Sequence, residues 1–376
     1  MNVHELPMIL FTVIGQMSVG AFWVLGVIHV YGYSKKMSPQ VVDRITNTGL
    51  YAAGPLLVLG FVAAFFHLGD PLNALNTLRH VASSWQSREI ASGIAYGVAG
   101  FAFASSQWFG WFSRGVRQVL AVLTALAGFL LVATMAGTYY SVETIPAWHH
   151  PAVWVFFFGS AILTGSLAVG VALLITWNIT TKTTTTDTDT AGTTGTGTDA
   201  STTDTASTTD TGTADTGDTN TGTDAGVGGV VTRVRPLVRW RVVSGEPLSG
   251  ELGVLTTRAL AGICLAAALS GVAILVMYPL YVLDLANGVE AAREVAGRLL
   301  MPGTVVRLVL LAVVVVLAGV FAFVRARSAQ RPSRVLAWII VSAFVLAVVS
   351  ELLGRGMHYE GLYHVGLNTT QYLLGH

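Results

Sequence analysis

The chain has 376 residues, of which 53% are hydrophobic and 11% are charged, with a formal net charge of +1. Soluble domains carry about 25% charged residues, so this composition excludes an ordinary soluble protein. No basic domain is present, and we therefore expect no nucleic-acid partner. The single cysteine, Cys264, excludes a disulfide framework, and it excludes any iron–sulfur cluster held by this chain alone, since such clusters need about four thiolates.

Long apolar runs recur along the chain. Eight of them qualify as membrane spans, at about 7–32, 46–67, 89–110, 117–137, 151–176, 254–281, 304–323 and 335–353. A helix needs about 20 apolar residues to cross about 30 Å of hydrocarbon, and the runs lack the alternation of barrel strands. The sequence therefore predicts an all-α integral membrane protein with eight transmembrane helices. The N-terminus lacks a basic region and a small-residue cleavage site, so we expect no cleaved signal peptide.

Small residues recur at helical spacing inside these runs. Gly93, Gly97 and Gly100 lie in the third run, and Gly159, Gly165 and Gly170 lie in the fifth. Small residues let helices approach closely in lipid. We interpret these glycines as packing positions.

Residues 180–229 differ in composition from the rest, being almost only Thr, Asp, Gly, Ala and Ser. Such a tract cannot form an apolar core, so we expect a long disordered loop. It divides the chain into 1–179 with spans one to five, the linker 180–229, and 230–376 with spans six to eight and a C-terminal tail. The last part begins with a basic leader that we expect to lie against anionic lipid head groups, formed by Arg233, Arg235, Arg239 and Arg241.

The distribution of Lys and Arg predicts the orientation. One alternate set of connections holds most of them, within 35–44, 114–117, 182–241 and 325–334, and the other set holds Arg79, Arg88, Arg293, Arg298 and Arg355. Connections rich in Lys and Arg stay in the cytoplasm. We therefore expect a cytoplasmic Thr/Asp-rich loop and extracytoplasmic termini. The preference remains when the long loop is left out of the comparison.

The turn between the second and third spans carries the first candidate site. His67 ends one span and Glu89 begins the next. A neutral imidazole can accept a proton from a hydroxyl group, and a carboxylate suits a helix N-terminus. Arg79 and Arg88 are candidates to balance the acid, and Ser84 or Ser87 is a candidate cap. The structural alternative is a histidine bonded to backbone and an acid that only compensates the helix dipole.

A second polar cluster closes the eighth span. Glu351 and Arg355 stand four residues apart, an arrangement that favours an ion pair on a helix. By the predicted topology this cluster lies on the same outer side as His67 and Glu89. A purely structural ion pair is the alternative.

Histidine positions argue against haem on this chain. Haem between spans needs paired axial ligands at matching depth. His29 lies near the inner end of the first span and His67 near the outer end of the second, so one haem cannot use both. Metal-ligand spacings and phosphate-binding loops are also absent from the sequence, so we expect no metal site.

Several motifs resemble a known family. Residues 5–20, His67–Pro71 with Ala74–Asn76, Ser87–Gly93, Tyr140–Trp148 and Glu351–Gly356 are similar to the membrane anchor subunit of anaerobic dimethyl sulfoxide reductases, the DmsC family. The resemblance runs from residue 5 to about 366 and excludes the Thr/Asp-rich tract, which departs from the family pattern.

The resemblance implies a multi-pass subunit of a prokaryotic plasma membrane that serves anaerobic respiration. It would anchor a molybdopterin catalytic subunit and a four-cluster, ferredoxin-like iron–sulfur subunit, and it would oxidise menaquinol without haem or cluster of its own. His67 would bind the quinol, with Glu89 nearby, so the chain would supply only the quinol-oxidising site of a reductase complex. We expect the partners to dock on the outer side, where the electron path is short.

Two other functions remain open from the sequence. A structural anchor without quinol chemistry would make His67 and Glu89 structural residues. A secondary transporter would need an inverted repeat around a site at mid-membrane depth. No convincing internal repeat is present, and the polar groups gather at one face.

Overall fold

The computed structural model describes residues 6–37, 39–67, 74–109, 111–192 and 250–360. Within these ranges every regular element is helical and none is a strand, which confirms the all-α class. The chain divides into two units, one of Met1–Thr180 with Leu248–His376 and the other of Thr181–Pro247. All the candidate site residues belong to the first unit.

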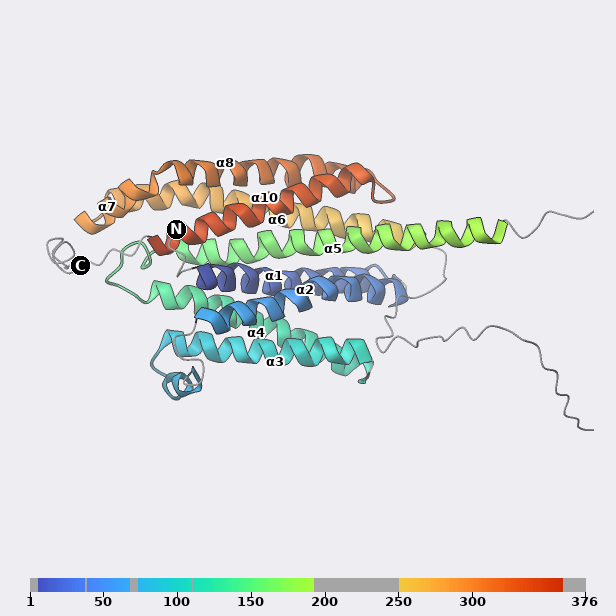
Figure 1. Cartoon of the computed structure of the whole chain (residues 1–376), viewed down its shortest axis with the longest axis horizontal. Coiled ribbons are helices and arrows are strands. Elements are labelled where there is room, and N and C mark those ends of the chain that lie inside the picture. The colour runs from blue at the N-terminus through green and yellow to red at the C-terminus, as the bar shows by residue number, and fades with distance from the viewer. Residues whose placement is uncertain (1–5, 38, 68–73, 110, 193–249, 361–376) are drawn as a thin grey trace, which may run out of the picture. The chain divides into compact units, whose positions relative to one another are not determined.

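The helices lie where the apolar runs predict them (Figure 1). Their bounds are α1 Leu6–Ser34, α2 Pro39–His67, η2 Ala74–His80, α3 Trp85–Phe109, α4 Arg114–Tyr140, α5 Ala152–Gly192, α6 Gly250–Ala286, α7 Glu290–Leu299, α8 Pro302–Val316, η3 Leu317–Ala322, α9 Phe323–Ser328 and α10 Arg334–Glu360. Segment η3 is π-helical and joins α8 to α9 without a break. Each of the eight predicted runs therefore corresponds to one continuous helical segment.

Seven helices in the described part of the chain are long and apolar enough to cross a membrane. They correspond to α1, α2, α4, α5, α6, the continuous α8–η3–α9 segment and α10. Helix α3, the predicted third span, is 25 residues long but is not among them. Its first turns carry Gln86, Ser87, Arg88 and Glu89, and its last turn carries Gln107, so its apolar stretch is short. The protein is thus a multi-pass membrane protein, and the predicted eighth crossing stays a prediction.

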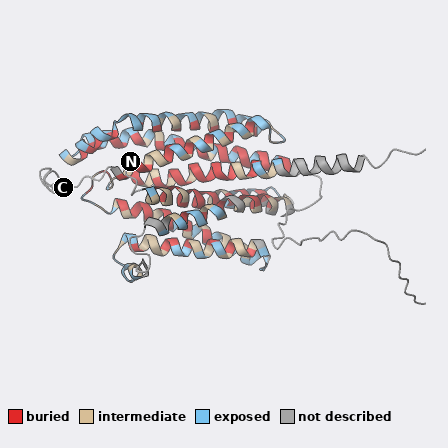
Figure 2. Ribbon diagram, in the orientation of Figure 1, coloured by how far each residue is buried: buried red, intermediate tan, exposed pale blue. Residues whose placement is uncertain are grey.

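Helices α1 and α5 are the most enclosed (Figure 2). In an apolar stretch of 18 residues from each of these two helices, 67% and 72% of the residues are buried, against 28% in the corresponding stretch of Pro302–Ser328. Helix α1 packs on α2, α4 and α10, while α3 packs mainly on α4 and α8 packs on α10 and α6. The core therefore runs along α1 and α5, and the outer helices present apolar faces outward.

Close contact between α1 and α5 depends on two glycines. A Cβ atom added at Gly165 would collide with the backbone of Gly20 and Ala21, and one added at Gly20 would collide with the carbonyl of Ala161. Gly97 similarly faces the ring of Phe61. The predicted packing role of Gly97 and Gly165 is confirmed, because the space that a side chain would need is filled by a neighbouring helix.

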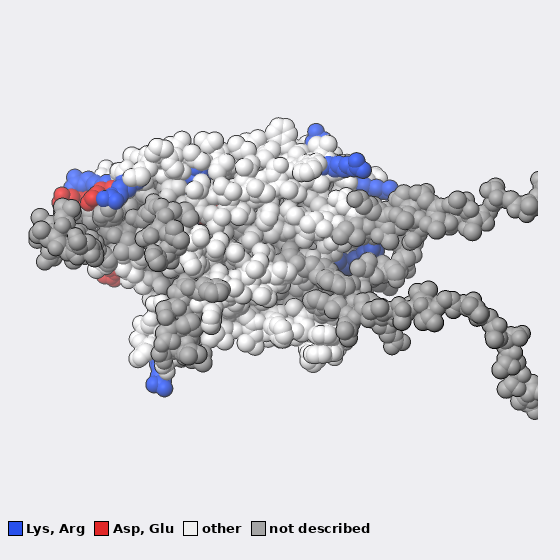
Figure 3. Space-filling view, viewed as in Figure 1, with Lys and Arg blue, Asp and Glu red and all other residues white. Residues whose placement is uncertain are grey.

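Charged side chains gather toward the two ends of the first unit, and the surface between them is almost free of them on the face that Figure 3 shows. Many large apolar side chains are exposed on the described helices, for example Phe101, Leu126, Val276, Val309 and Trp338. Exposed apolar area on this scale is expected where lipid tails replace water.

The structure shows additional helix beyond three of the predicted spans. Helix α10 continues to Glu360, so the predicted tail after residue 353 begins as helix. The predicted connection 282–303 contains the end of α6 and the amphipathic helix α7. Helix α5 extends to Gly192, into residues predicted to be disordered. Polar helical turns that project past the apolar run explain the added length of α10 and α5, since hydropathy marks the lipid-facing length and not the helix end. Residues 193–249, with the rest of the tract and the basic leader, lie outside the described residues.

Candidate functional site at one end of the bundle

The first predicted site residue is only partly visible. Helix α2 ends at His67, as predicted, but the side chain of His67 and residues 68–73 lie outside the described residues. The short helix η2 then leads to α3. The placement of the His67 ring therefore remains a prediction from the sequence.

The start of α3 is held by its own turn. The Ser84 hydroxyl accepts a hydrogen bond from the Ser87 N–H at 3.3 Å, which confirms Ser84 as the cap. Arg88 donates from Nε to the carbonyl of Val81 at 2.9 Å and from Nη2 to the carbonyl of Ala82 at 2.7 Å. Its guanidinium also lies over the Trp85 ring, 4.6 Å from the centroid. These contacts order the connection before α3.

The two arginines predicted to balance Glu89, Arg79 and Arg88, form no ion pair with it in the described structure. Arg88 is used by the preceding turn, and Arg79 is exposed on η2. Among the described residues no ion pair involves Glu89. The half-buried Glu89 instead accepts a hydrogen bond at Oε2 from the Thr138 hydroxyl of α4, at 3.0 Å. One turn further along α3, Ser92 bonds Thr134 at 2.7 Å.

A pair of tyrosines adjoins Glu89. The hydroxyl of Tyr139, next to Thr138, donates to the hydroxyl of Tyr359 on α10 at 3.1 Å. Thr12 on α1 lies 3.4 Å from the same Tyr359 hydroxyl. Tyr139 directly follows Thr138, the hydrogen-bond donor to Glu89. A carboxylate and a chain of hydroxyl groups from α1, α3, α4 and α10 therefore meet at one end of the bundle.

Arg355 is buried beside this chain of hydroxyls, and its partners differ from the predicted one. Its Nη2 donates to Oε1 of Gln16 on α1 at 2.9 Å, and its guanidinium lies 3.7 Å from the centroid of the Phe157 ring. In the described structure no ion pair joins it to Glu351. The i,i+4 spacing places both side chains at the same end, but α1 and α5 provide the contacts that Arg355 makes.

The segment between α4 and α5 covers this end of the bundle. Trp148 donates from Nε1 to the carbonyl of His358 at 2.9 Å, and its ring stacks on the His358 ring with centroids 5.8 Å apart. The Tyr281 hydroxyl donates to the carbonyl of Ala147 at 3.0 Å. The segment thereby holds the ends of α6 and α10 in place.

Sequence reasoning missed several residues of this site. It placed His358 and Tyr359 outside the spans, and it gave no role to Thr138 or Tyr139. One signal was present, since Thr138-Tyr139-Tyr140 is a run of hydroxyl-bearing residues at the end of an apolar helix. It correctly placed Glu89, Glu351 and Arg355 at the same end of the bundle.

The arrangement can handle protons. A carboxylate with a hydroxyl donor can accept a proton from a bound hydroxyl compound, and neighbouring hydroxyls can pass protons on. No group of three or more His, Cys, Asp or Glu side chains suited to a metal ion occurs in the described part of the chain. The fold and the site define a helical, multi-pass membrane protein with a polar end that carries the Glu89 carboxylate.

The chain belongs to the DMSO reductase anchor subunit (DmsC) family, whose model matches residues 1–190. The matched part contains Glu89, Thr138 and Tyr139, whereas Arg355 and Tyr359 lie beyond it. The family membership expected from the motifs is therefore confirmed.

Relatives with assigned names agree with the family. The chain is 30% identical over 181 residues to the anaerobic dimethyl sulfoxide reductase chain YnfH of Escherichia coli, covering 48% of this chain and 61% of that one. It is 32% identical over 179 residues to an anaerobic dimethyl sulfoxide reductase chain of Haemophilus influenzae, covering 46% and 60%. Similarity extends to a sulfite dehydrogenase subunit of Allochromatium vinosum, 31% over 123 residues, covering 30% and 38%. The matched stretch thus spans less than two thirds of each of these relatives.

Proposed function

We propose that this protein is the membrane anchor subunit of a molybdopterin oxidoreductase of the dimethyl sulfoxide reductase type. It binds menaquinol at the end of the bundle where Glu89 lies, oxidises it, and passes the electrons to an iron–sulfur partner subunit. That partner hands them to a molybdopterin catalytic subunit in anaerobic respiration. The chain itself carries no haem and no cluster.

The observation that carries this proposal is the environment of Glu89. The carboxylate is half-buried, accepts a hydrogen bond from Thr138, and adjoins the Tyr139–Tyr359 hydroxyl pair. Oxidation of a quinol releases two protons and two electrons, so a site needs a proton acceptor and a nearby electron acceptor. Glu89 supplies the first, with His67 at the end of α2 as the proposed quinol ligand. Because the chain has a single cysteine and an iron–sulfur cluster needs about four thiolates, the electron acceptor belongs to another chain.

The topology proposed with this function has eight crossings. In this proposal α3, which packs on α4, supplies the eighth crossing, so that both termini lie on the same side. The distribution of Lys and Arg supports the outer side of a prokaryotic plasma membrane for the termini and for the Glu89 end. The partner subunits then dock on the outer side, beside the quinol. Arg79 and Arg88 lie before or at the start of α3 and shape the rim of that end.

The test compares three variants in membranes that contain the whole complex. His67→Ala and Glu89→Gln should abolish menaquinol-dependent reduction of the acceptor while the complex still assembles. Glu143→Gln, which alters an exposed carboxylate, serves as the matched control and should keep wild-type activity. Fluorescence titration with a quinol-site inhibitor should show one saturable site that His67→Ala weakens.

The same titration separates the alternatives. An anchor without quinol chemistry would show no saturable inhibitor site in the wild-type complex. Unchanged activity in both His67→Ala and Glu89→Gln would leave the quinol proposal without its site. Substrate uptake by proteoliposomes that contain only this chain would instead favour a transporter.

A further inference from the structure

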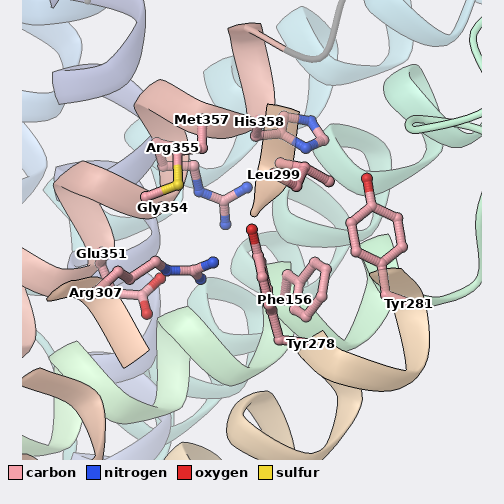
Figure 4. Close-up of a pocket in the computed structure, with 10 residues that line it drawn as sticks. All are labelled: Phe156, Tyr278, Tyr281, Leu299, Arg307, Glu351, Gly354, Arg355, Met357 and His358. Carbon is pink, nitrogen blue, oxygen red and sulfur yellow. The ribbon is translucent and has the colours of Figure 1, made fainter. Parts of the chain in front are cut away.

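A second polar pocket lies among α5, α6, α8 and α10 (Figure 4). Its polar lining consists of Tyr278, Tyr281, Arg307, Glu351, Arg355 and His358, with apolar side chains around them. Arg355 and His358 also contact the residues next to Glu89, whereas Tyr278, Arg307 and Glu351 were not part of that site. The pocket lies outside the residues 1–190 that match the family except for its wall on α5.

Several buried atoms at this pocket have no hydrogen-bond partner in the described structure. They are Nε of Arg307, Oε1 of Glu351, the Tyr278 hydroxyl and Nε2 of His358. The Arg307 and Glu351 residues are 4% and 2% exposed, and no ion pair within 4.0 Å joins them. Two opposite charges thus face one pocket without touching each other.

The environment compensates these charges only in part. The Arg307 guanidinium lies over the Tyr278 ring, 4.9 Å from its centroid, and Gly354 leaves the space that this guanidinium occupies. A cation over an aromatic face gains roughly 0.5–2 kcal/mol, whereas a buried ion without hydrogen bonds costs several kcal/mol. Buried polar groups are otherwise almost always bonded to protein or to ordered water. The arrangement requires a further group in the pocket.

Size and polarity identify that group. The pocket offers about 30 Å³ to the centres of water-sized molecules, and one bound water needs about 10–15 Å³. A cation would be repelled by Arg307 and Arg355, and an anion would be attracted by these two groups but would leave the Glu351 carboxylate without a donor. Water accepts from the guanidinium and donates to the carboxylate, so it satisfies both.

We propose that this pocket holds about two water molecules between Arg307, Glu351 and Tyr278, and that Glu351 receives the protons released at Glu89. This second part rests on the proposed quinol oxidation. Menaquinol loses two electrons to the iron–sulfur partner and two protons to the protein, giving menaquinone. The two protons pass one at a time: Glu89 takes each from the quinol, and Glu351 releases it to solvent water before the next arrives. Both carboxylates therefore end the turnover in the state in which they began it.

Buried groups of α4 and α10 lie between the two sites. The hydroxyls of Tyr139 and Tyr359 bond each other, and Tyr139 directly follows Thr138, the hydrogen-bond donor to Glu89. The His358 ring contacts the Tyr139 ring edge-on, with centroids 4.8 Å apart, and His358 also lines the pocket. Arg355 lies beside Tyr359 and lines the pocket as well. Water in the pocket completes the connection to Glu351.

The experiment uses the whole complex with Glu351→Gln and Tyr278→Phe, and with Glu294→Gln on α7 as the exposed-carboxylate control. Glu351→Gln should slow menaquinol oxidation about tenfold or more and raise the solvent deuterium isotope effect, because a proton acceptor is lost. Tyr278→Phe should act in the same direction by a smaller factor. Quinol-site inhibitor affinity should stay within about twofold of wild type in all three.

A density map that resolves waters supplies a readout independent of activity. It should show water within hydrogen-bond distance of Glu351 Oε1 and Arg307 Nε, and an empty pocket or a bound anion would overturn the proposal. Wild-type rates and isotope effects in both pocket variants, with normal inhibitor binding, would overturn the relay and leave the quinol function standing. Absence of inhibitor binding in the wild type would instead overturn the quinol function. If Glu351→Gln does not assemble, Tyr278→Phe decides the outcome.

Discussion

The hydroxyl groups of Tyr139 and Tyr359 lie 3.1 Å apart, although 220 residues separate them in the chain. Tyr139 lies in the last turn of α4, inside the part that matches the family, and Tyr359 lies in the last turn of α10, outside it. Thr12 of α1 lies next to the same pair. The two halves of the helical unit are therefore joined by buried polar contacts at the end that carries the candidate site.

Removing this contact should weaken the junction. Tyr359→Phe deletes one hydroxyl, and we expect a loss of about 1 kcal/mol in the free energy of unfolding, the usual value for a buried hydrogen bond. Thermal unfolding in detergent measures it. A double-mutant cycle with Tyr139→Phe should show coupling between the two substitutions, while Tyr140→Phe should not couple to Tyr359→Phe. Strict additivity in the first cycle would mean that the hydroxyl contact contributes nothing.

The hydrogen bond from Thr138 to Glu89 should tune the reaction. Thr138→Val keeps the shape of the side chain and removes the donor, so the carboxylate loses a bond worth roughly 1.5 kcal/mol. We expect the rate of menaquinol oxidation to fall about tenfold if the whole energy of that bond stabilises the transition state. Thr138→Ser restores the hydroxyl and should recover most of the rate. Equal rates for the valine and serine variants would show that the donor does not matter.

The contact between α1 and α5 should not tolerate a larger residue. Gly165→Leu forces a side chain into the backbone of Gly20 and Ala21, and overpacking of this kind costs about 1–3 kcal/mol or more. The amount of folded protein in membranes should fall sharply. Gly262→Leu, at a helical glycine with open space around it, is the matched control. A normal yield for Gly165→Leu would contradict the close approach of these two helices.

The buried Arg355–Gln16 bond should contribute more than a similar bond that is less buried. Gln16→Leu leaves the guanidinium without this acceptor, and we expect a loss of about 1.5–3 kcal/mol in the free energy of unfolding. Arg117 donates to Gln107 at 2.6 Å in a half-buried setting, so Gln107→Leu provides the comparison. Its loss should be smaller, because water can replace the missing acceptor. Chemical denaturation in detergent measures both losses. A loss for Gln107→Leu that equals or exceeds the loss for Gln16→Leu would show that burial is unimportant.

Much of the fold was predictable because hydropathy reports directly on lipid contact. Each predicted run from 7–32 to 335–353 corresponds to a helix, and the packing glycines were recognised from their spacing. The third run is the weakest case, since α3 is less apolar than its neighbours. Helix ends were missed where polar turns continue the helix, as at Tyr359 in α10 and Gly192 in α5.

The candidate site was predictable in part. Glu89, Glu351 and Arg355 stood out because charged residues are rare in so apolar a chain, and rarity in a membrane segment signals function. Their partners did not follow from spacing. Arg355 stands four residues from Glu351, yet it bonds Gln16, more than three hundred positions away in the chain. Arg88, next to Glu89, bonds the turn before it.

The sequence by itself determined that the protein is helical, that it crosses a membrane several times, and that its polar groups collect at one end. These properties depend on local composition and on apolar runs of about 20 residues, and both can be recognised in each segment separately. Only the tertiary structure decided which polar groups meet, from Glu89 with Thr138 to Arg307 and Glu351 around one pocket. Which polar groups meet depends on the orientation of α1, α5 and α10 about their own axes. Packing between the helices sets that orientation, so the sequence of one helix alone does not determine it.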